Sequence, residues 1–104
     1  MPITTVNPAT GELVRSFEPL SSRQIEEKLQ RAAETFPTFR RLSFAQRGAM
    51  MNRAAQILEA EKEALGRLMT TEMGKTLQSA IAEAVKCASA CRYYACLLYT
   101  SRCV

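Results

Sequence analysis

The chain has 104 residues, enough for one small domain that would bury roughly two-thirds of its extended surface. Its hydrophobic share of 47% and charged share of 23% are near the globular average, which argues against intrinsic disorder. The formal net charge is +4, but the 14 Lys and Arg residues are scattered. A nucleic-acid interface usually gathers its cations into a stripe. We therefore interpret the nearest grouping, at Arg40, Arg41 and Arg47, as a solvated helix face and expect no nucleic-acid partner.

The sequence contains neither a membrane-spanning run nor a secretory leader. No apolar stretch approaches the eighteen or so residues that a spanning helix needs. The N-terminal MPITTVNPATGEL lacks the basic start and apolar stretch of a signal peptide. We therefore expect no membrane partner and a cytoplasmic location, where the four cysteines would be free thiols.

The first segment predicts a β-hairpin. Residues Ile3 to Val6 are β-branched, and residues Leu13 to Phe17 alternate apolar and polar side chains. Between them lies Asn7-Pro8-Ala9-Thr10-Gly11, in which Pro fixes one turn dihedral and Gly allows a positive one. A two-stranded hairpin is marginally stable alone, so this one is expected to lie against a surface that the chain does not contain.

Two helices are predicted next, each opened by a capping box. Ser21 with Gln24 and Ser43 with Gln46 have the spacing in which a hydroxyl and a side-chain amide satisfy each other's backbone N–H groups. Pro37 is expected to close the first helix, because the residue before a proline avoids helical geometry. The apolar stripes are Ile25, Leu29, Ala32, Ala33 and Phe36 in the first helix, and Phe44, Met51, Ala55 and Leu58 in the second.

Two further helices follow a charged break at Glu59 to Glu63. The shorter one carries Leu65, Leu68 and Met69 and ends at Gly74. The last is expected from about Leu77 to Ala95, and the fragment is then mainly α-helical with an N-terminal hairpin, in the order ββαααα. The apolar face of this last helix consists of Leu77, Ile81, Ala84, Val85, Ala88 and Cys91.

The residues that usually carry chemistry are absent or badly placed. There is no histidine, which removes the commonest general base and metal ligand. The four glycines are too far apart for a phosphate-binding loop. In EMGK, Glu72 and Lys75 flank Gly74, and we interpret this turn as a helix C-cap with Gly74 left-handed.

The four cysteines, at 87, 91, 96 and 103, invite a zinc interpretation that their spacing does not favour. Cys87 and Cys91 are one helical turn apart on a face of small residues, which indicates buried or half-buried helix thiols. A nucleophilic role is disfavoured because both lie late in their helix, where the dipole opposes a thiolate. We therefore predict no metal site.

The last nine residues, CLLYTSRCV from Cys96 to Val104, break the pattern. They contain no acid and no helical period, so neither helix nor strand is predicted there. Through Ser101 they match the translation of TGTCTCTTATACACATCT, which resembles the transposon end used to tag sequencing libraries. We therefore expect residues 96–104 to be a non-native tail that follows an open reading frame interrupted after Ala95.

Five features before this tail occur together in a characteristic order: VNPATGEL at 6–13, the AAETF helix end at 32–36, Arg47, LMTTEMGKTL at 68–77 and AEAVKCASACRYYA at 82–95. Together they resemble the N-terminal region of NAD(P)-dependent aldehyde dehydrogenases, and the residues are most similar to those of bacterial succinate-semialdehyde dehydrogenases. One departure is Thr76, where that family usually has proline.

The resemblance implies that residues 1–95 are the N-terminal segment of the cofactor-binding domain of an α/β enzyme several times longer. In that family a cysteine thiolate attacks the aldehyde, hydride passes to NAD or NADP, and a glutamate activates water to release the acid. An asparagine side chain and a backbone amide hold the oxyanion. No position here matches the motifs for these residues or for the cofactor-binding lysine, so no catalytic, cofactor-binding or metal-binding residue is assigned.

Two functional hypotheses remain open. The first is a truncated oxidoreductase, inactive and cofactor-free, whose homo-oligomeric parent oxidises an aldehyde such as succinate semialdehyde with NAD(P). The second is a free-standing helical domain that binds a protein partner through its apolar stripes. The second predicts a cooperative thermal transition for the isolated chain, whereas the first predicts weak helicity, aggregation or molten behaviour.

Overall fold

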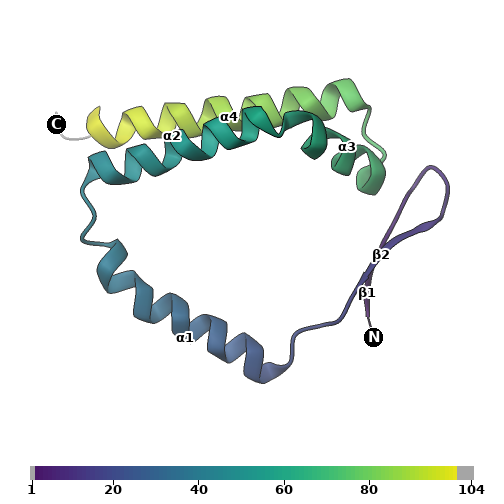
Figure 1. Cartoon of the computed structure of the whole chain (residues 1–104), viewed down its shortest axis with the longest axis horizontal. Coiled ribbons are helices and arrows are strands. Elements are labelled where there is room, and N and C mark those ends of the chain that lie inside the picture. The colour runs from purple at the N-terminus through teal and green to yellow at the C-terminus, as the bar shows by residue number, and fades with distance from the viewer. Residues whose placement is uncertain (1, 101–104) are drawn as a thin grey trace.

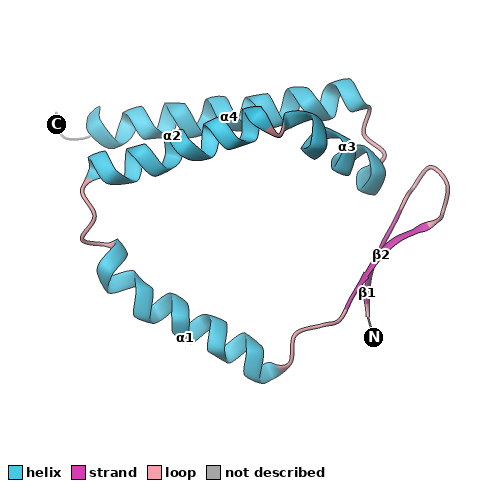
Figure 2. Ribbon diagram, in the orientation of Figure 1, coloured by secondary structure: helices cyan, strands magenta, loops and turns pink. Residues whose placement is uncertain are grey.

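The computed structural model describes the backbone of residues 2–100 and the side chains of residues 2–97. The described part is mainly helical, with a two-stranded antiparallel sheet followed by helices, which confirms the predicted order ββαααα (Figures 1 and 2). No helix in this part is both long and apolar enough to cross a membrane. The elements are β1 (Ile3–Val6), β2 (Leu13–Phe17), α1 (Ser22–Phe39), α2 (Phe44–Ala60), α3 (Lys62–Met73) and α4 (Leu77–Thr100).

The hairpin has the bounds that the sequence predicted. Ile3 pairs with Phe17 at its open end, and the register shifts between Thr5 and Val6. The turn is closed by Gly11, whose N–H donates to the Asn7 carbonyl at 2.8 Å and whose φ is +75°. This positive φ explains why the turn requires glycine there.

Helix α1 begins as predicted but ends later. Ser21 and Gln24 form the complete capping box. Pro37 lies inside the helix, which continues to Phe39 and so contradicts the expected end before Pro37. A proline loses its own N–H bond and its ring crowds the carbonyl four residues before it. Only Thr38 and Phe39 follow Pro37 in α1, so little of the helix lies beyond this disturbance. Beyond Pro37, the Arg40 N–H still donates to the Phe36 carbonyl at 2.8 Å.

Helices α2 and α4 run antiparallel, side by side, along one edge of the structure (Figure 1). Their contact is lined by small side chains, so the two backbones approach closely. Helix α3 packs on the same helix α4, where Gly66 lies against Ile81. The buried apolar side chains of the described part are all alanines: Ala55, Ala80, Ala84, Ala88 and Ala95.

The break between α2 and α3 and the end of α3 agree with the sequence. Glu61 leaves helical geometry, with φ −100° and ψ 7°, between the two helices. Gly74 is left-handed at φ +71° and caps α3, which confirms the interpretation of EMGK as a C-cap. A Cβ at Gly74 would lie 3.1 Å from Cγ of Pro8. The absence of a side chain at Gly74 therefore lets the hairpin turn pack closely against the end of α3.

Helix α4 extends to Thr100, beyond the end expected at Ala95. Residues 96–100 contain no proline or glycine to stop it, and the backbone ladder continues although the apolar period does not. The absence of a helix prediction there was therefore wrong for these five residues. Residues 101–104, the remainder of the expected tail, lie outside the described residues.

Candidate functional site

The apolar face of α1 has no partner among the described residues. This helix lies apart from the α2–α4 pair (Figure 1), and none of its residues is buried. The hairpin is similarly open, with Ile3 60% and Leu13 62% exposed. We call the face of α1 the α1 stripe, defined as Ile25, Leu29, Ala32, Phe36 and Phe39.

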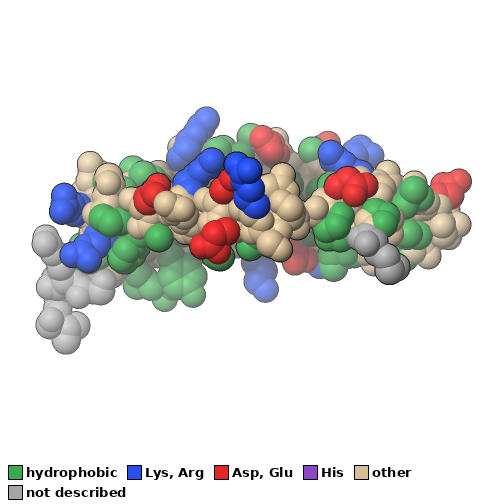
Figure 3. Space-filling view, turned by 90° about the horizontal axis from the view of Figure 1, so that it is seen from below, with side chains coloured by type: hydrophobic (Ala, Val, Ile, Leu, Met, Phe, Trp, Pro, Cys, Tyr) green, Lys and Arg blue, Asp and Glu red, His purple; other side chains and the backbone are tan. Residues whose placement is uncertain are grey.

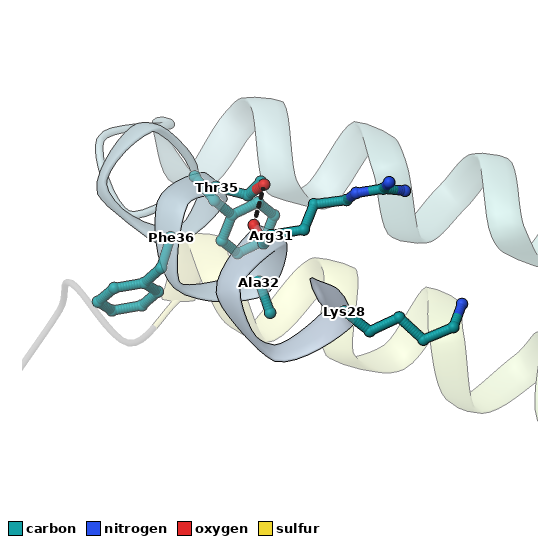
Figure 4. A pocket seen from close by; sticks show the side chains of 6 residues that line it. Lys28, Arg31, Ala32, Thr35 and Phe36 are labelled. Carbon is teal, nitrogen blue, oxygen red and sulfur yellow. Dashed lines mark hydrogen bonds between the residues drawn. The ribbon is translucent and has the colours of Figure 1, made fainter. Parts of the chain in front are cut away.

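A shallow hollow of about 460 Å³ lies along the C-terminal half of α1. In Figure 4, Lys28 and Arg31 extend to one side and the Phe36 ring to the other, and the Thr35 hydroxyl donates to the Arg31 carbonyl at 2.7 Å. All the lining residues come from this one helix, so no second element supplies convergent polar groups. Binding sites for small molecules combine an enclosed cavity with such groups. This hollow fits a protein surface better than a small molecule.

Arg47 fixes the corner between α1 and α2. Its Nη2 donates to the Arg40 carbonyl at 2.8 Å, so it satisfies an acceptor at the end of α1. Its guanidinium carbon lies 5.4 Å from the ring centroid of Phe39 and 5.7 Å from that of Phe44. A guanidinium can stack on aromatic rings and donate at the same time, which a lysine cannot do equally well. The sequence pointed to Arg47 through the family resemblance. The interpretation of Arg47 as part of a solvated helix face was wrong, because its side chain is half-buried between the two rings.

A second hollow, of about 570 Å³, is lined by Lys75 of EMGK and by residues of α4. Lys75 Nζ donates to the Glu83 carboxylate, and this hydrogen bond lowers the pKa of Glu83. Ser79, Lys86 and Cys87 complete the polar lining. Because Lys75 is already paired with Glu83, the hollow offers no free carboxylate–amine pair for acid–base chemistry.

The other cross-helix ion pair joins α2 to α4. Both terminal nitrogens of Arg92 donate to the Glu59 carboxylate, at 2.5 and 2.6 Å, across 33 positions of sequence. The hydrogen bond from Arg92 lowers the pKa of Glu59, and the same bond raises the pKa of Arg92. A bidentate pair of this kind restricts both the distance and the register of the two helices. The sequence suggested only that Glu59 belongs to a charged break.

We expect acid to remove the contribution of this ion pair to stability. The pKa of Glu59 is lower in the folded chain than the ordinary value of about 4.3. Its contribution is therefore present above that value and is lost as the pH falls through the lower, folded-state value. Thermal unfolding followed by circular dichroism from about pH 7 to pH 2.5 should show Glu59→Gln less stable than the unsubstituted chain near neutrality, with the difference vanishing in acid.

The matched control for this titration is Glu18→Gln, the same change at an exposed residue between β2 and α1. It should not alter the unfolding midpoint near neutrality. A stability difference for Glu59→Gln that persists unchanged at the acid end would contradict the assignment.

The cysteines do not assemble into a site within the described residues. Cys91 is half-buried, as expected, whereas Cys87 is exposed, so the expected burial was wrong for Cys87. Cys96 is also exposed, and all three thiols are free. Cys103 lies outside the described residues. No group of three or more potential ligating side chains that could hold a metal ion occurs in the part that the structure describes.

In Figure 3, which views the molecule from the side of α1, acidic and basic side chains are interspersed rather than separated by sign.

Comparison of the sequence with known proteins gives one consistent family. Residues 1–102 match the aldehyde dehydrogenase family. A succinate-semialdehyde dehydrogenase [NADP(+)] of Mycobacterium avium is 51% identical over 96 residues, which are 91% of this chain and 20% of that protein. The enzyme of the same name from Mycobacterium leprae is 50% identical over 95 residues, 91% of this chain and 21% of that protein. The chain thus spans about a fifth of the length of these relatives.

Solved structures agree with the sequence comparison. Succinic semialdehyde dehydrogenase from Streptococcus pyogenes, in complex with NADP+, superposes with a TM-score of 0.83 at 28% identity. The match covers 88% of this chain and 20% of that one. An NADP-dependent glyceraldehyde-3-phosphate dehydrogenase from Bacillus halodurans gives a TM-score of 0.86 at 27% identity, over 91% of this chain and 20% of that one. By its sequence match, and with a fold that agrees, the chain belongs to the aldehyde dehydrogenase family.

Proposed function

We propose that this chain is the N-terminal segment of a succinate-semialdehyde dehydrogenase that uses NADP. The observation that supports this most directly is the identity of about half of the aligned residues, over nine-tenths of the chain, to relatives that carry that name. The parent would be a cytoplasmic homo-oligomer. Its aldehyde chemistry would belong to residues outside this chain, because none of the positions here matches the motifs that carry it.

The 104 residues would themselves act as scaffold. The exposed faces of the hairpin and α1, together with corners fixed by Arg47 and Gly74, support this role, since they present preformed apolar surfaces without convergent catalytic groups. The scaffold would have no dehydrogenase activity and would bind no cofactor alone. The remainder of the parent would cover the apolar face of α1. Apolar side chains stabilise a fold only when they are removed from water, so this face would become stabilising in the parent.

The test compares the chain with its genomic continuation. The DNA across codons 95 to 104 and beyond is sequenced from the source, and the reading frame that continues from Ala95 is expressed. The extended protein should reduce NADP with succinate semialdehyde, and the 104-residue chain should not. Activity of the short chain would contradict the scaffold assignment, and an extended protein that oxidises only unrelated aldehydes would contradict the substrate.

The same DNA tests the proposed tail. If codons 96 to 101 read TGTCTCTTATACACATCT in the sequenced library and differ in the source genome, residues 96–104 are an addition to the natural protein. Synonymous codons with another spelling would contradict this origin. Residues 96–102, which lie within the family match, would then be native sequence.

A further inference from the structure

The α1 stripe has the spacing of a helix that pairs with another helix. Its members follow one another at intervals of four, three, four and three residues. This is the heptad spacing, with Leu29 and Phe36 at the first core position and Ile25, Ala32 and Phe39 at the second. Helix α1 begins with a complete capping box, and none of its residues is buried.

The members of the stripe are accessible in the chain as it stands. Ile25 is 47% exposed, Leu29 60%, Phe36 59% and Phe39 45%. An amphipathic helix with this much uncovered apolar surface gains free energy when a second apolar helix covers it.

We propose that the 104-residue chain forms a twofold dimer in which the α1 stripes of two copies pack antiparallel. In the register that sets Leu29 opposite Phe39 of the second copy, Ala32 lies opposite Phe36 of that copy. The twofold axis makes each of these two contacts occur twice in the dimer. Each large ring is then matched by a smaller side chain, which allows the two faces to interdigitate.

Charge selects this register. Glu26 and Arg40 each follow a residue of the second core position, so both flank the stripe on the same side. In the antiparallel register Glu26 lies beside Arg40 of the second copy, and symmetry makes this pair twice. Neither residue takes part in the ion pairs found among the described residues. Charged residues that flank a helix pair set its orientation and partner.

The alternatives lack this complementarity. A parallel pair would place Arg40 beside Thr35 of the second copy, which carries no charge. An antiparallel pair shifted by one heptad, with Ile25 opposite Phe36, would place Glu26 beside Ala33. The observed sequence thus offers two opposite-charge pairs in one arrangement and none in the other two.

The dimer should be weak, because the helix offers less than three heptads and so less area than a standard protein interface. Analytical ultracentrifugation of the full chain under reducing conditions, from about 5 to about 200 µM, should show a reversible monomer–dimer equilibrium. Leu29→Glu should abolish it across this range. Met50→Glu, the same kind of change at a residue of α2 that is 53% exposed, should leave it intact and controls for folding by circular dichroism.

The charge pair gives a second, independent measurement. Glu26→Arg and Arg40→Glu should each weaken the dimer on the order of tenfold, because each replaces two attractive contacts with repulsive ones. The double variant should recover the original dissociation constant. Exchange of Arg23 and Glu27, which form an ion pair within α1, should have no effect on it.

Two results would overturn the proposal. A chain that stays monomeric at every concentration would leave the stripe to another occupant, such as the remainder of a longer polypeptide. A dimer that ignores Leu29→Glu or the charge exchange would use another face. Both results concern the oligomeric state of the short chain and are independent of whether its extended form oxidises succinate semialdehyde.

Discussion

Ala88→Leu should destabilise the α2–α4 pair by about 2 kcal/mol or more, because it inserts three carbons at a helix contact that has no space for them. Ala88 is fully buried, as are Ala55 and Ala80 on the two facing helices. Close-packed interiors accept little added volume, so the helices must separate or the leucine must adopt a strained rotamer. Thermal unfolding followed at 222 nm should show a large fall in midpoint or a loss of cooperativity.

The control for this prediction is Ala90→Leu, the same substitution two residues further along α4. Ala90 is exposed, so its leucine extends into solvent and helix propensity hardly changes. Its effect should stay within about 0.5 kcal/mol. If Ala88→Leu and Ala90→Leu behave alike, the α2–α4 contact is not close-packed in solution.

The burial of alanines shows what could be predicted from the sequence and what could not. The face of α4 was identified from its period, and its members Ala84 and Ala88 are indeed buried. The sequence did not single out Ala80 and Ala95, which are buried as deeply. A periodicity argument gives weight to large apolar residues, whereas a close helix crossing selects small ones. Leu68 shows the opposite error, since it was assigned to a stripe and is 53% exposed.

The predictions that depend only on neighbouring residues were confirmed. Both capping boxes, the turn glycine Gly11 and the left-handed Gly74 depend on residues within a few positions of one another. Pro37 does not end α1, because the cost of a proline falls on its own missing N–H and on the turn before it, and the helix continues for the two residues after it. The end of α4 was misplaced because apolar period was treated as a condition for helix, although a helix continues until something stops it.

The long-range contacts could not be predicted from one sequence. Nothing local brings Glu59 to Arg92, 33 positions away, and the pair is evident only once α2 and α4 are antiparallel. The same holds for Arg47, whose role at the corner needs Phe39 and Phe44 on either side of a loop. The family resemblance identified the scaffold, but these contacts explain how its helices are held.

Gly66→Ala should destabilise the contact of α3 with α4, although alanine is the better helix former. The added Cβ would lie 2.7 Å from Cγ1 of Ile81 and 3.2 Å from its backbone nitrogen. The first contact is closer than atoms tolerate, and the second involves backbone, so α3 must shift. We expect a net loss of about 1–2 kcal/mol, since the overpacking outweighs the gain of about 1 kcal/mol in helix propensity.

A double-mutant cycle with Ile81→Ala separates these two effects. Ile81→Ala removes Cγ1, so Gly66→Ala in that background should cost less than in the unsubstituted chain, by at least about 0.5 kcal/mol. Arg67→Ala, at the exposed neighbour of Gly66 in the same helix, is the control and should change the unfolding midpoint little. Additive effects of Gly66→Ala and Ile81→Ala would mean that Gly66 does not touch α4 in solution. The close approach of α3 to α4 would then have to be explained by other residues, such as Leu65 and Met69.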